Sequence, residues 1–147
     1  MSYKSPIEDF KYNLAMLNYD EVIAGIEKFK EYDSETLMSV VSEIGRLNEQ
    51  EVLDSNKIGD REGLKYVTDG EEGPEVHTPE RFKKLYDAVK SSGYVGATMP
   101  TQYGGGGAPF TTAILAGEIG IAANMAFYMG PGSVSYTHLT LPTIYSV

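Results

Sequence analysis

Apolar residues recur at helical spacing through most of this chain, and this pattern constrains its fold more than any other feature. The spacing is clearest after Ser34, where one face carries Leu37, Val40, Val41, Ile44 and Leu47. Because residues three and four apart lie on the same side of an α-helix, this stripe predicts an amphipathic helix with a buried apolar face. We expect Ser34 to cap this helix, which should run to about Leu53.

The same spacing predicts three further helices on either side of that segment. A Ser-Pro pair at residues 5–6 and Asp20 are expected to begin two of them before Ser34. A Thr-Pro pair at residues 78–79 should begin the third, and Gly93 should end it. Their apolar faces are, in order, Ile7, Phe10, Leu14 and Leu17; Val22, Ile23, Ile26 and Phe29; and Phe82, Leu85, Tyr86 and Val89.

A long apolar helix is predicted from Pro109 or Phe110, with a second short helix from about Asn124 to the Gly-Pro-Gly at 130–132. Two segments rich in glycine and proline separate the predicted helices, at residues 56–79 and 94–109. We expect both to be loops, the first with at most short strands. With no confident strand before Gly132, the predicted fold class is mainly α.

Composition excludes several classes of function. The 147 residues carry a formal net charge of −9, which argues against nucleic acid or an anionic membrane as partner. The absence of cysteine excludes disulfides and thiolate catalysis. No metal site is predicted, since His77 and His138 are too far apart to suggest zinc. The N-terminus shows no apolar secretory leader, so a cytoplasmic location is expected.

The segment from Thr111 to Met129 is long and apolar enough to span a bilayer. It contains Glu118 and Asn124, and no basic residue flanks it closely. These features favour a buried core helix over a membrane span. A membrane-associated helix pair stays as the weaker alternative.

Two features invite a functional interpretation beside a plain structural one. The run Gly104–Gly107 precedes a helix, so its backbone could approach a phosphate. It lacks the GxxxxGK[ST] pattern, and a tight turn between helices is the alternative. Glu118, the single charge in an apolar helix, could be a general base with a raised pKa, a buried paired acid, or an exposed residue. His77 is expected to be a surface loop residue.

Five segments in order resemble the N-terminal region of the acyl-CoA dehydrogenases, in the branch with an extra N-terminal helical extension that includes the methylthiopropanoyl-CoA dehydrogenase type. They are "YKSPIEDFKYNL", "NKIGDREG", "HTPERFKKLYDAVKSSGYVG", "MPTQYGGGGAP" and "GEIGIAANMAFYMGPG". The fourth is similar to the family's P-x-x-Y-G-G-x-G-x-P loop and is the most specific. One departure is that "EVLDSNKIGD" lacks a proline and is a residue shorter than the usual form.

The resemblance implies an FAD-dependent oxidoreductase that converts an acyl-CoA to the 2,3-enoyl-CoA and passes electrons to an acceptor. The family fold has an N-terminal helical domain, a middle β domain and a C-terminal helical domain. A glutamate that removes the α-proton and most flavin contacts lie beyond this region, so no catalytic residue is expected here and Glu118 is not the base. Met125, Met129 and Gly130 are our candidates for one wall of the acyl pocket, with plain core packing as the alternative. Flexible methionines would suit an apolar or thioether chain.

The resemblance ends near Ser133, and the last 29 residues, from Ile119 onward, carry no charged side chain. We therefore expect residues 1–33 to be the helical extension, 34–132 the N-terminal helical domain, and 133–147 an unrelated, poorly ordered tail produced by read-through. The implied parent is several hundred residues longer and forms a homo-oligomer, and this fragment is expected to lack FAD and activity. A stand-alone helical binding module without catalysis is the alternative function.

Overall fold

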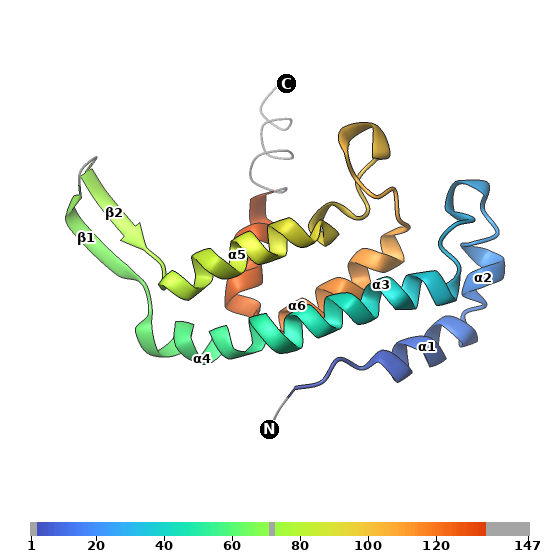
Figure 1. The fold of residues 1–147 in the computed structure, drawn as a ribbon, viewed down its shortest axis with the longest axis horizontal. Helices are drawn as coiled ribbons and strands as arrows, with labels where there is room; N and C mark the ends of the chain where they lie inside the picture. Colours follow the sequence, from blue (N-terminus) through green and yellow to red (C-terminus); the bar gives the residue numbers. More distant parts are fainter. Residues whose placement is uncertain (1–2, 71–72, 135–147) are drawn as a thin grey trace, which may run out of the picture.

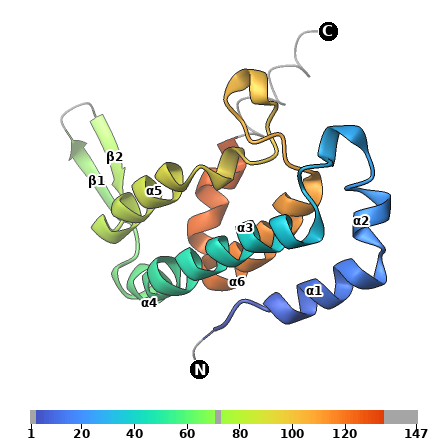
Figure 2. The ribbon, with the colours of Figure 1, turned by 45° about the vertical axis from the view of Figure 1, so that its right-hand side comes forward.

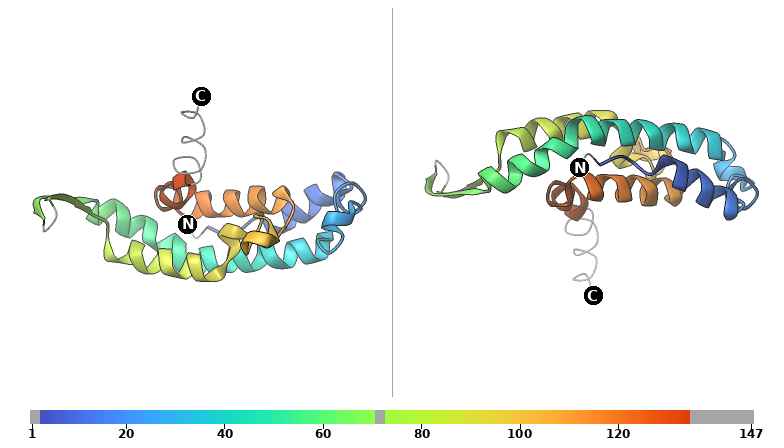
Figure 3. Two further views of the ribbon diagram at one scale, coloured as in Figure 1. Left: turned by 90° about the horizontal axis from the view of Figure 1, so that it is seen from above. Right: turned by 90° about the horizontal axis from the view of Figure 1, so that it is seen from below.

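The computed structural model describes residues 3–70 and 73–134, the last four as backbone only. The helices form an elongated body with a hairpin projecting from one end (Figures 1 and 3). The main elements are α1 (Ile7–Met16), α2 (Tyr19–Val22), α3 (Ser34–Leu47), α4 (Leu53–Glu62), β1 (Lys65–Gly70), β2 (Gly73–His77), α5 (Glu80–Ser92) and α6 (Phe110–Val134). This architecture confirms the mainly α fold class predicted from the sequence.

Helix α3 contains the stripe that the sequence predicted, with Leu37, Val41 and Ile44 buried. Its cap is Asp33 rather than Ser34, since Asp33 Oδ1 accepts a hydrogen bond from the Thr36 amide at 2.8 Å. Hydrogen bonds from the Thr36 hydroxyl and amide lower the pKa of Asp33. The predicted start of this helix was therefore wrong by one residue.

The predicted end of this helix was also wrong, because the rod continues for nine residues beyond Leu53. A π-helical turn at Asn48–Val52 joins α3 to α4, which ends at Glu62. At Gly63 the backbone takes a positive φ of 62° that glycine adopts readily. Part of the predicted first loop is therefore helical.

The N-terminal caps also differ from the predictions. Helix α1 begins after Pro6 without a side-chain cap, and the Ser5 amide donates instead to Glu49 Oε1 at 2.7 Å. The expected second helix is only the four residues of α2, followed by a 3₁₀ turn at Glu27–Phe29. Asp20 accepts hydrogen bonds from the Ser34 amide and hydroxyl, and these bonds connect α2 to the start of α3.

The rest of the predicted first loop is an antiparallel hairpin of β1 and β2, in which Lys65 pairs with His77 and Tyr66 with Val76. The Tyr66 and Val76 side chains are exposed. A two-stranded sheet of this kind gains little stability by itself. Strand periodicity is weak in this segment, so the sequence indicated only short strands.

Helix α5 ends as predicted at Gly93, which has a positive φ of 76°. Its start differs, because Pro79 precedes the first turn and no side chain caps it. Leu85 and Val89 form the buried face, whereas Tyr86 is 47% exposed. The segment after Gly93 is irregular, as predicted, with short 3₁₀ turns at Tyr94–Gly96 and Thr101–Tyr103.

Helix α6 is two helical segments joined at Asn124, whose φ of −159° and ψ of 91° are not helical. The sequence predicted this division. Within the described residues, Phe110–Gly130 is the one helix long and apolar enough to cross a membrane, with 39% of its most apolar window buried. Core helices pass the same test of length and composition, so this is weak evidence for a span.

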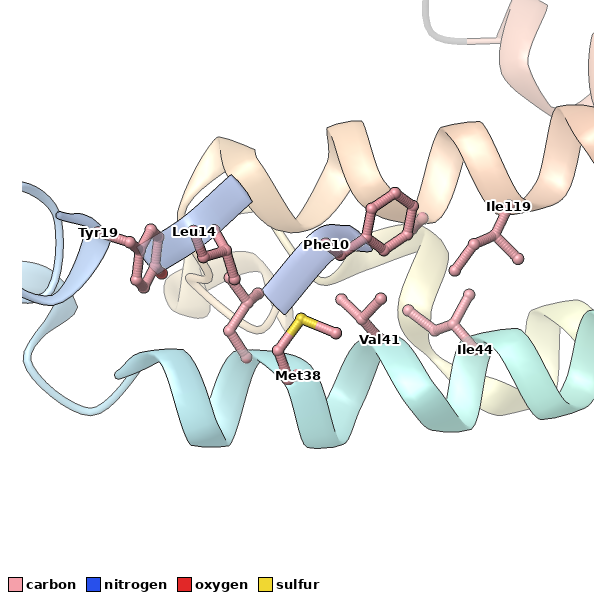
Figure 4. Close-up of a cluster of buried hydrophobic side chains, with 9 residues drawn as sticks. Phe10, Leu14, Tyr19, Met38, Val41, Ile44 and Ile119 are labelled. Atoms are coloured by element: carbon pink, nitrogen blue, oxygen red, sulfur yellow. The ribbon is translucent and has the colours of Figure 1, made fainter. Parts of the chain in front are cut away.

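Two clusters of buried apolar side chains hold the helices together. The first lies between α1, α3 and the first part of α6, where Figure 4 shows Phe10, Val41 and Ile119 pointing toward one another. The second joins the π-helical turn, α5 and the part of α6 around its bend, through Val52, Leu85, Val89, Ala123 and Phe127. The expected tail boundary at Ser133 falls inside α6, and residues 135–147 lie outside the described residues.

Candidate functional site

A groove of about 480 Å³ lies where the end of α4, the base of the hairpin, α5 and the last segment of α6 meet. These elements lie close to one another in Figure 1. The groove is lined by Leu64, Thr78, Phe82, Lys83, Tyr86, Ala126, Phe127 and Gly130. Most of these side chains are apolar, which suits an apolar ligand group better than a charged one.

A second hollow of about 310 Å³ shares Leu64, Phe82 and Ala126 with the groove and extends it toward Asn124. Phe82 lines both hollows, and its ring meets Phe127 edge to face at a centroid distance of 5.8 Å. Gly59 allows this position, because a Cβ on Gly59 would lie 2.6 Å from the Phe82 ring. The two hollows therefore adjoin each other at Leu64, Phe82 and Ala126.

A buried polar chain lies beneath these hollows, at the bend of α6. The Asn124 side chain donates from Nδ2 to Ser55 Oγ at 2.7 Å, and its Oδ1 accepts from the Phe127 amide at 3.0 Å. Ser55 Oγ in turn donates to the Val52 carbonyl at 2.6 Å. Asn124 and Ser55 are both almost fully buried, so each polar group requires the partner it has.

A second polar chain joins the π-helical turn to the last segment of α6. Tyr128 Oη donates to Asn48 Oδ1 at 2.8 Å, and Asn48 Nδ2 donates to the Ile44 carbonyl at 2.8 Å. Tyr94 Oη makes a short hydrogen bond with Tyr128 Oη. Burial raises the pKa of both tyrosines, and the contact with Tyr94 raises that of Tyr128 further. Both hydroxyls therefore stay protonated at neutral pH and serve as hydrogen-bond donors.

The four glycines at 104–107 form a tight turn in which none of their backbone amides is free. The N–H groups of the four glycines at 104–107 donate, in order, to the carbonyls of Thr101, Pro100, Gly96 and Met99. A Cβ on Gly105 would collide with the Met99 carbonyl, so glycine is needed there for close backbone packing. The phosphate-loop interpretation is therefore wrong, the turn interpretation holds, and the loop does not fit the pyrophosphate of a dinucleotide.

Glu118 is exposed and lines neither hollow, so the structure does not place it as a buried base or a buried paired acid. Its charge contributes, after burial, to raising the pKa of Tyr3. His77 is exposed on the hairpin with its Nε2 3.0 Å from Glu75 Oε2, as the surface interpretation requires. Across residues 3–70 and 73–134, no group of three or more His, Cys, Asp or Glu side chains could hold a metal ion.

The three candidates for the pocket wall lie on the last segment of α6 and are all exposed. Gly130 lines the groove, whereas Met125 and Met129, with exposed fractions of 58% and 67%, lie outside its lining. Their assignment to a pocket wall stays a prediction. Sequence reasoning missed Phe82 as a lining residue of both hollows and Asn48, Ser55 and Tyr128 as polar partners. The one usable signal was an Asn, a common capping residue, at the expected start of the last helix.

Comparison with known proteins bears on this site. No family model matches the chain. The chain is 26% identical over 131 residues, 89% of its length, to the 3-methylmercaptopropionyl-CoA dehydrogenase of Ruegeria pomeroyi. It spans about a fifth of the length of that curated relative, 21%. The resemblance inferred from the motifs is thereby confirmed: over most of its length, this chain is similar to one part of an acyl-CoA dehydrogenase.

Proposed function

We propose that this chain is part of a longer FAD-dependent acyl-CoA dehydrogenase, an oxidoreductase that forms a 2,3-enoyl-CoA from an acyl-CoA thioester. One observation carries the proposal. The similarity covers 89% of this chain but only 21% of the 3-methylmercaptopropionyl-CoA dehydrogenase. A match that covers so much of one chain and so little of the other is the pattern of a segment within a larger enzyme. We place the parent enzyme in the cytoplasm, as a homo-oligomer that passes electrons to an acceptor.

Within that enzyme, we assign this chain one wall of the acyl pocket, on the last segment of α6. The proposed wall residues are Met125, Met129 and Gly130. Gly130 shares its groove with Ala126 and Phe127, and that surface offers an acyl chain apolar contacts. The relative is named for a 3-methylmercaptopropionyl thioester, and a short thioether chain suits an apolar wall with neighbouring methionines.

No catalytic residue is assigned to this chain. The family resemblance puts the glutamate base and most flavin contacts in other domains, so FAD belongs to the parent and is not retained by these 147 residues alone. When bound, the flavin accepts the β-hydride of the substrate. The residues of this chain give the pocket wall its shape, which orients the acyl chain for that step, and they exclude water from it.

The proposal is tested with the longer protein encoded at the native locus. Purified, it should show flavin absorbance and reduce an artificial electron acceptor when given a short acyl-CoA, while the 147-residue chain should do neither. Filling the groove with Ala126→Phe should raise KM by about tenfold with less effect on kcat, the pattern of lost substrate binding. Ala122→Phe, at an exposed position on the same helix that lines neither hollow, is the matched control.

Two results would contradict the proposal. Absence of flavin and of acyl-CoA oxidation in the longer protein would remove the enzyme function and favour a helical binding module. Equal effects of Ala126→Phe and Ala122→Phe on KM would show that the groove is not part of the acyl site. The enzyme assignment would then still stand.

A further inference from the structure

The bend in α6 needs a specific cause, because its local sequence favours a straight helix. From Ile121 to Met129 the chain contains no proline and no glycine, the residues that most often kink helices. Alanine, methionine and phenylalanine surround the bend at Asn124. Figure 2 nevertheless shows the last segment, in red, turning away from the orange segment before it.

Asn124 supplies the two interactions that a bend requires. Its Oδ1 accepts the Phe127 amide at 3.0 Å, the hydrogen bond of a helix N-cap, so a new helix begins there. Its Nδ2 donates to Ser55 Oγ at 2.7 Å, which ties the start of that helix to α4. Asn124 is 1% exposed, so water does not compete for either bond.

The bent segment is also held at its next turn. Tyr128 donates to Asn48 in the π-helical turn, four residues beyond the cap. Its ring lies against Gly120, where a Cβ would be 2.8 Å from the ring carbons. Gly120 therefore gives Tyr128 room to fold back across the bend.

We propose that Asn124 is a positioning residue that sets the direction of the last segment of α6 and hence the shape of the groove. Ala126, Phe127 and Gly130, all on that segment, form one side of the groove. The hydrogen bond to the Phe127 amide makes the bend, and the bond to Ser55 fixes the bent segment against α4. The consequence for substrate binding rests on the proposed function, whereas the consequence for geometry does not.

The geometry can be measured directly, because the chain contains no cysteine and introduced cysteines are unique labelling sites. Spin labels at Ile114→Cys and Met129→Cys report the bend, since one of these exposed positions precedes Asn124 along α6 and the other follows it. A straight helix separates Cα atoms 15 residues apart by about 22 Å, and a bend shortens that distance. Labels at Lys57→Cys and Met129→Cys report the position of the segment against α4.

The two substitutions should have different effects, because Asn124→Ala removes both hydrogen bonds of Asn124, whereas Ser55→Ala removes only the bond to α4. Asn124→Ala removes the cap and should lengthen the 114–129 distance toward the straight-helix value, and Asn124→Ser, which keeps a capping oxygen, should restore the original distance. Ser55→Ala should broaden the 57–129 distribution and leave the 114–129 distance unchanged. A merely structural role would lower the melting temperature of each variant without moving either distance.

The proposal is wrong if Asn124→Ala folds with the original 114–129 distance, or if Ser55→Ala leaves both distributions unchanged. It is also wrong if both variants fail to fold, since the side chains would then be needed for folding rather than for direction. These distances require neither flavin nor substrate, so they stand independently of the enzyme assignment. In an active longer protein, Asn124→Ala should raise KM about tenfold more than Asn124→Ser does, as expected for lost ground-state binding.

Discussion

The two buried clusters are built by different means, although α6 contributes to both. The first packs α1 and α2 against α3 and the first part of α6 mainly through apolar side chains, with Leu37 and Val41 fully buried, and its one hydrogen-bonded member is Tyr19, whose hydroxyl donates to the Tyr32 carbonyl. The second packs five apolar side chains around a set of buried polar ones, among them Asn48, Ser55 and Asn124. Apolar burial is non-directional, whereas hydrogen bonds fix angles. The first cluster therefore holds helices together, and the second determines where the groove-lining segment points.

The largest effect is expected from breaking the first cluster. Leu37→Ala should lower the free energy of unfolding by about 2–5 kcal/mol, since it removes apolar contacts and leaves a cavity in a fully buried site. Urea denaturation followed by circular dichroism measures the change. Leu17→Ala, at a 71% exposed position, is the control and should change stability by less than about 0.5 kcal/mol.

Breaking the second cluster should have a smaller and less additive effect. Asn48→Ala should destabilise the protein by about 1–3 kcal/mol, because the partly buried Tyr128 hydroxyl loses its acceptor. Tyr128→Phe removes the other partner, so the double variant should lose less stability than the two single losses combined. Strict additivity in this double-mutant cycle would show that the polar chain is not a coupled unit.

Alkaline pH should weaken both clusters, since burial raises the pKa of Tyr19 in the first cluster as it does that of two tyrosines in the second. Burial raises the pKa of Tyr94 and Tyr128 above the ordinary value of about 10. Above that pH the unfolded chain loses these protons before the folded protein does, so stability falls as pH rises. Denaturation curves between about pH 9 and pH 11 should show this loss, and Tyr128→Phe should reduce its slope. A slope that Tyr128→Phe leaves unchanged would contradict this account.

The smallest effect is expected at the edge of the second cluster. Arg81 Nη2 lies 2.9 Å from Glu51 Oε2, and both side chains are partly exposed. Because solvent screens such pairs, Arg81→Met should lower the free energy of unfolding by no more than about 1 kcal/mol. The difference from the original protein should shrink in high salt. A loss as large as that of Leu37→Ala would mean that charge, rather than packing, joins α5 to the π-helical turn.

The same contrast explains what could be predicted from the sequence. The buried face of α3, the end of α5 at Gly93 and the division of α6 near Asn124 follow from periodicity and capping chemistry, which are local. The π-helical turn does not follow from local patterns. Residues 48–62 keep helical propensity, but their apolar spacing weakens, so the sequence does not show that the helix continues. The helix caps were less predictable, because the expected capping residues bond to other segments. Ser5 bonds to Glu49, and Ser34 and Asp20 bond to each other.

The groove could not be predicted, because its residues come from elements far apart in the sequence. Leu64 and Phe82 meet Ala126 only after the chain has folded back along α5 and α6. The polar chain has the same origin, since Ser55 and Asn124 are 69 residues apart. By contrast, the family resemblance rested on short local motifs, so the sequence was sufficient for it.

The most direct test of the central claim, that this chain is part of a longer acyl-CoA dehydrogenase, is a long DNA read through codons 125–147 and about a thousand bases beyond, a span set by the usual size of additional domains. We predict that the reading frame continues after Gly132 into sequence for a β domain and a C-terminal helical domain, and that the codons for residues 133–147 are absent from the native locus. A confirmed stop directly after Val147 would contradict the claim. The chain would then be a helical binding module related to part of an enzyme.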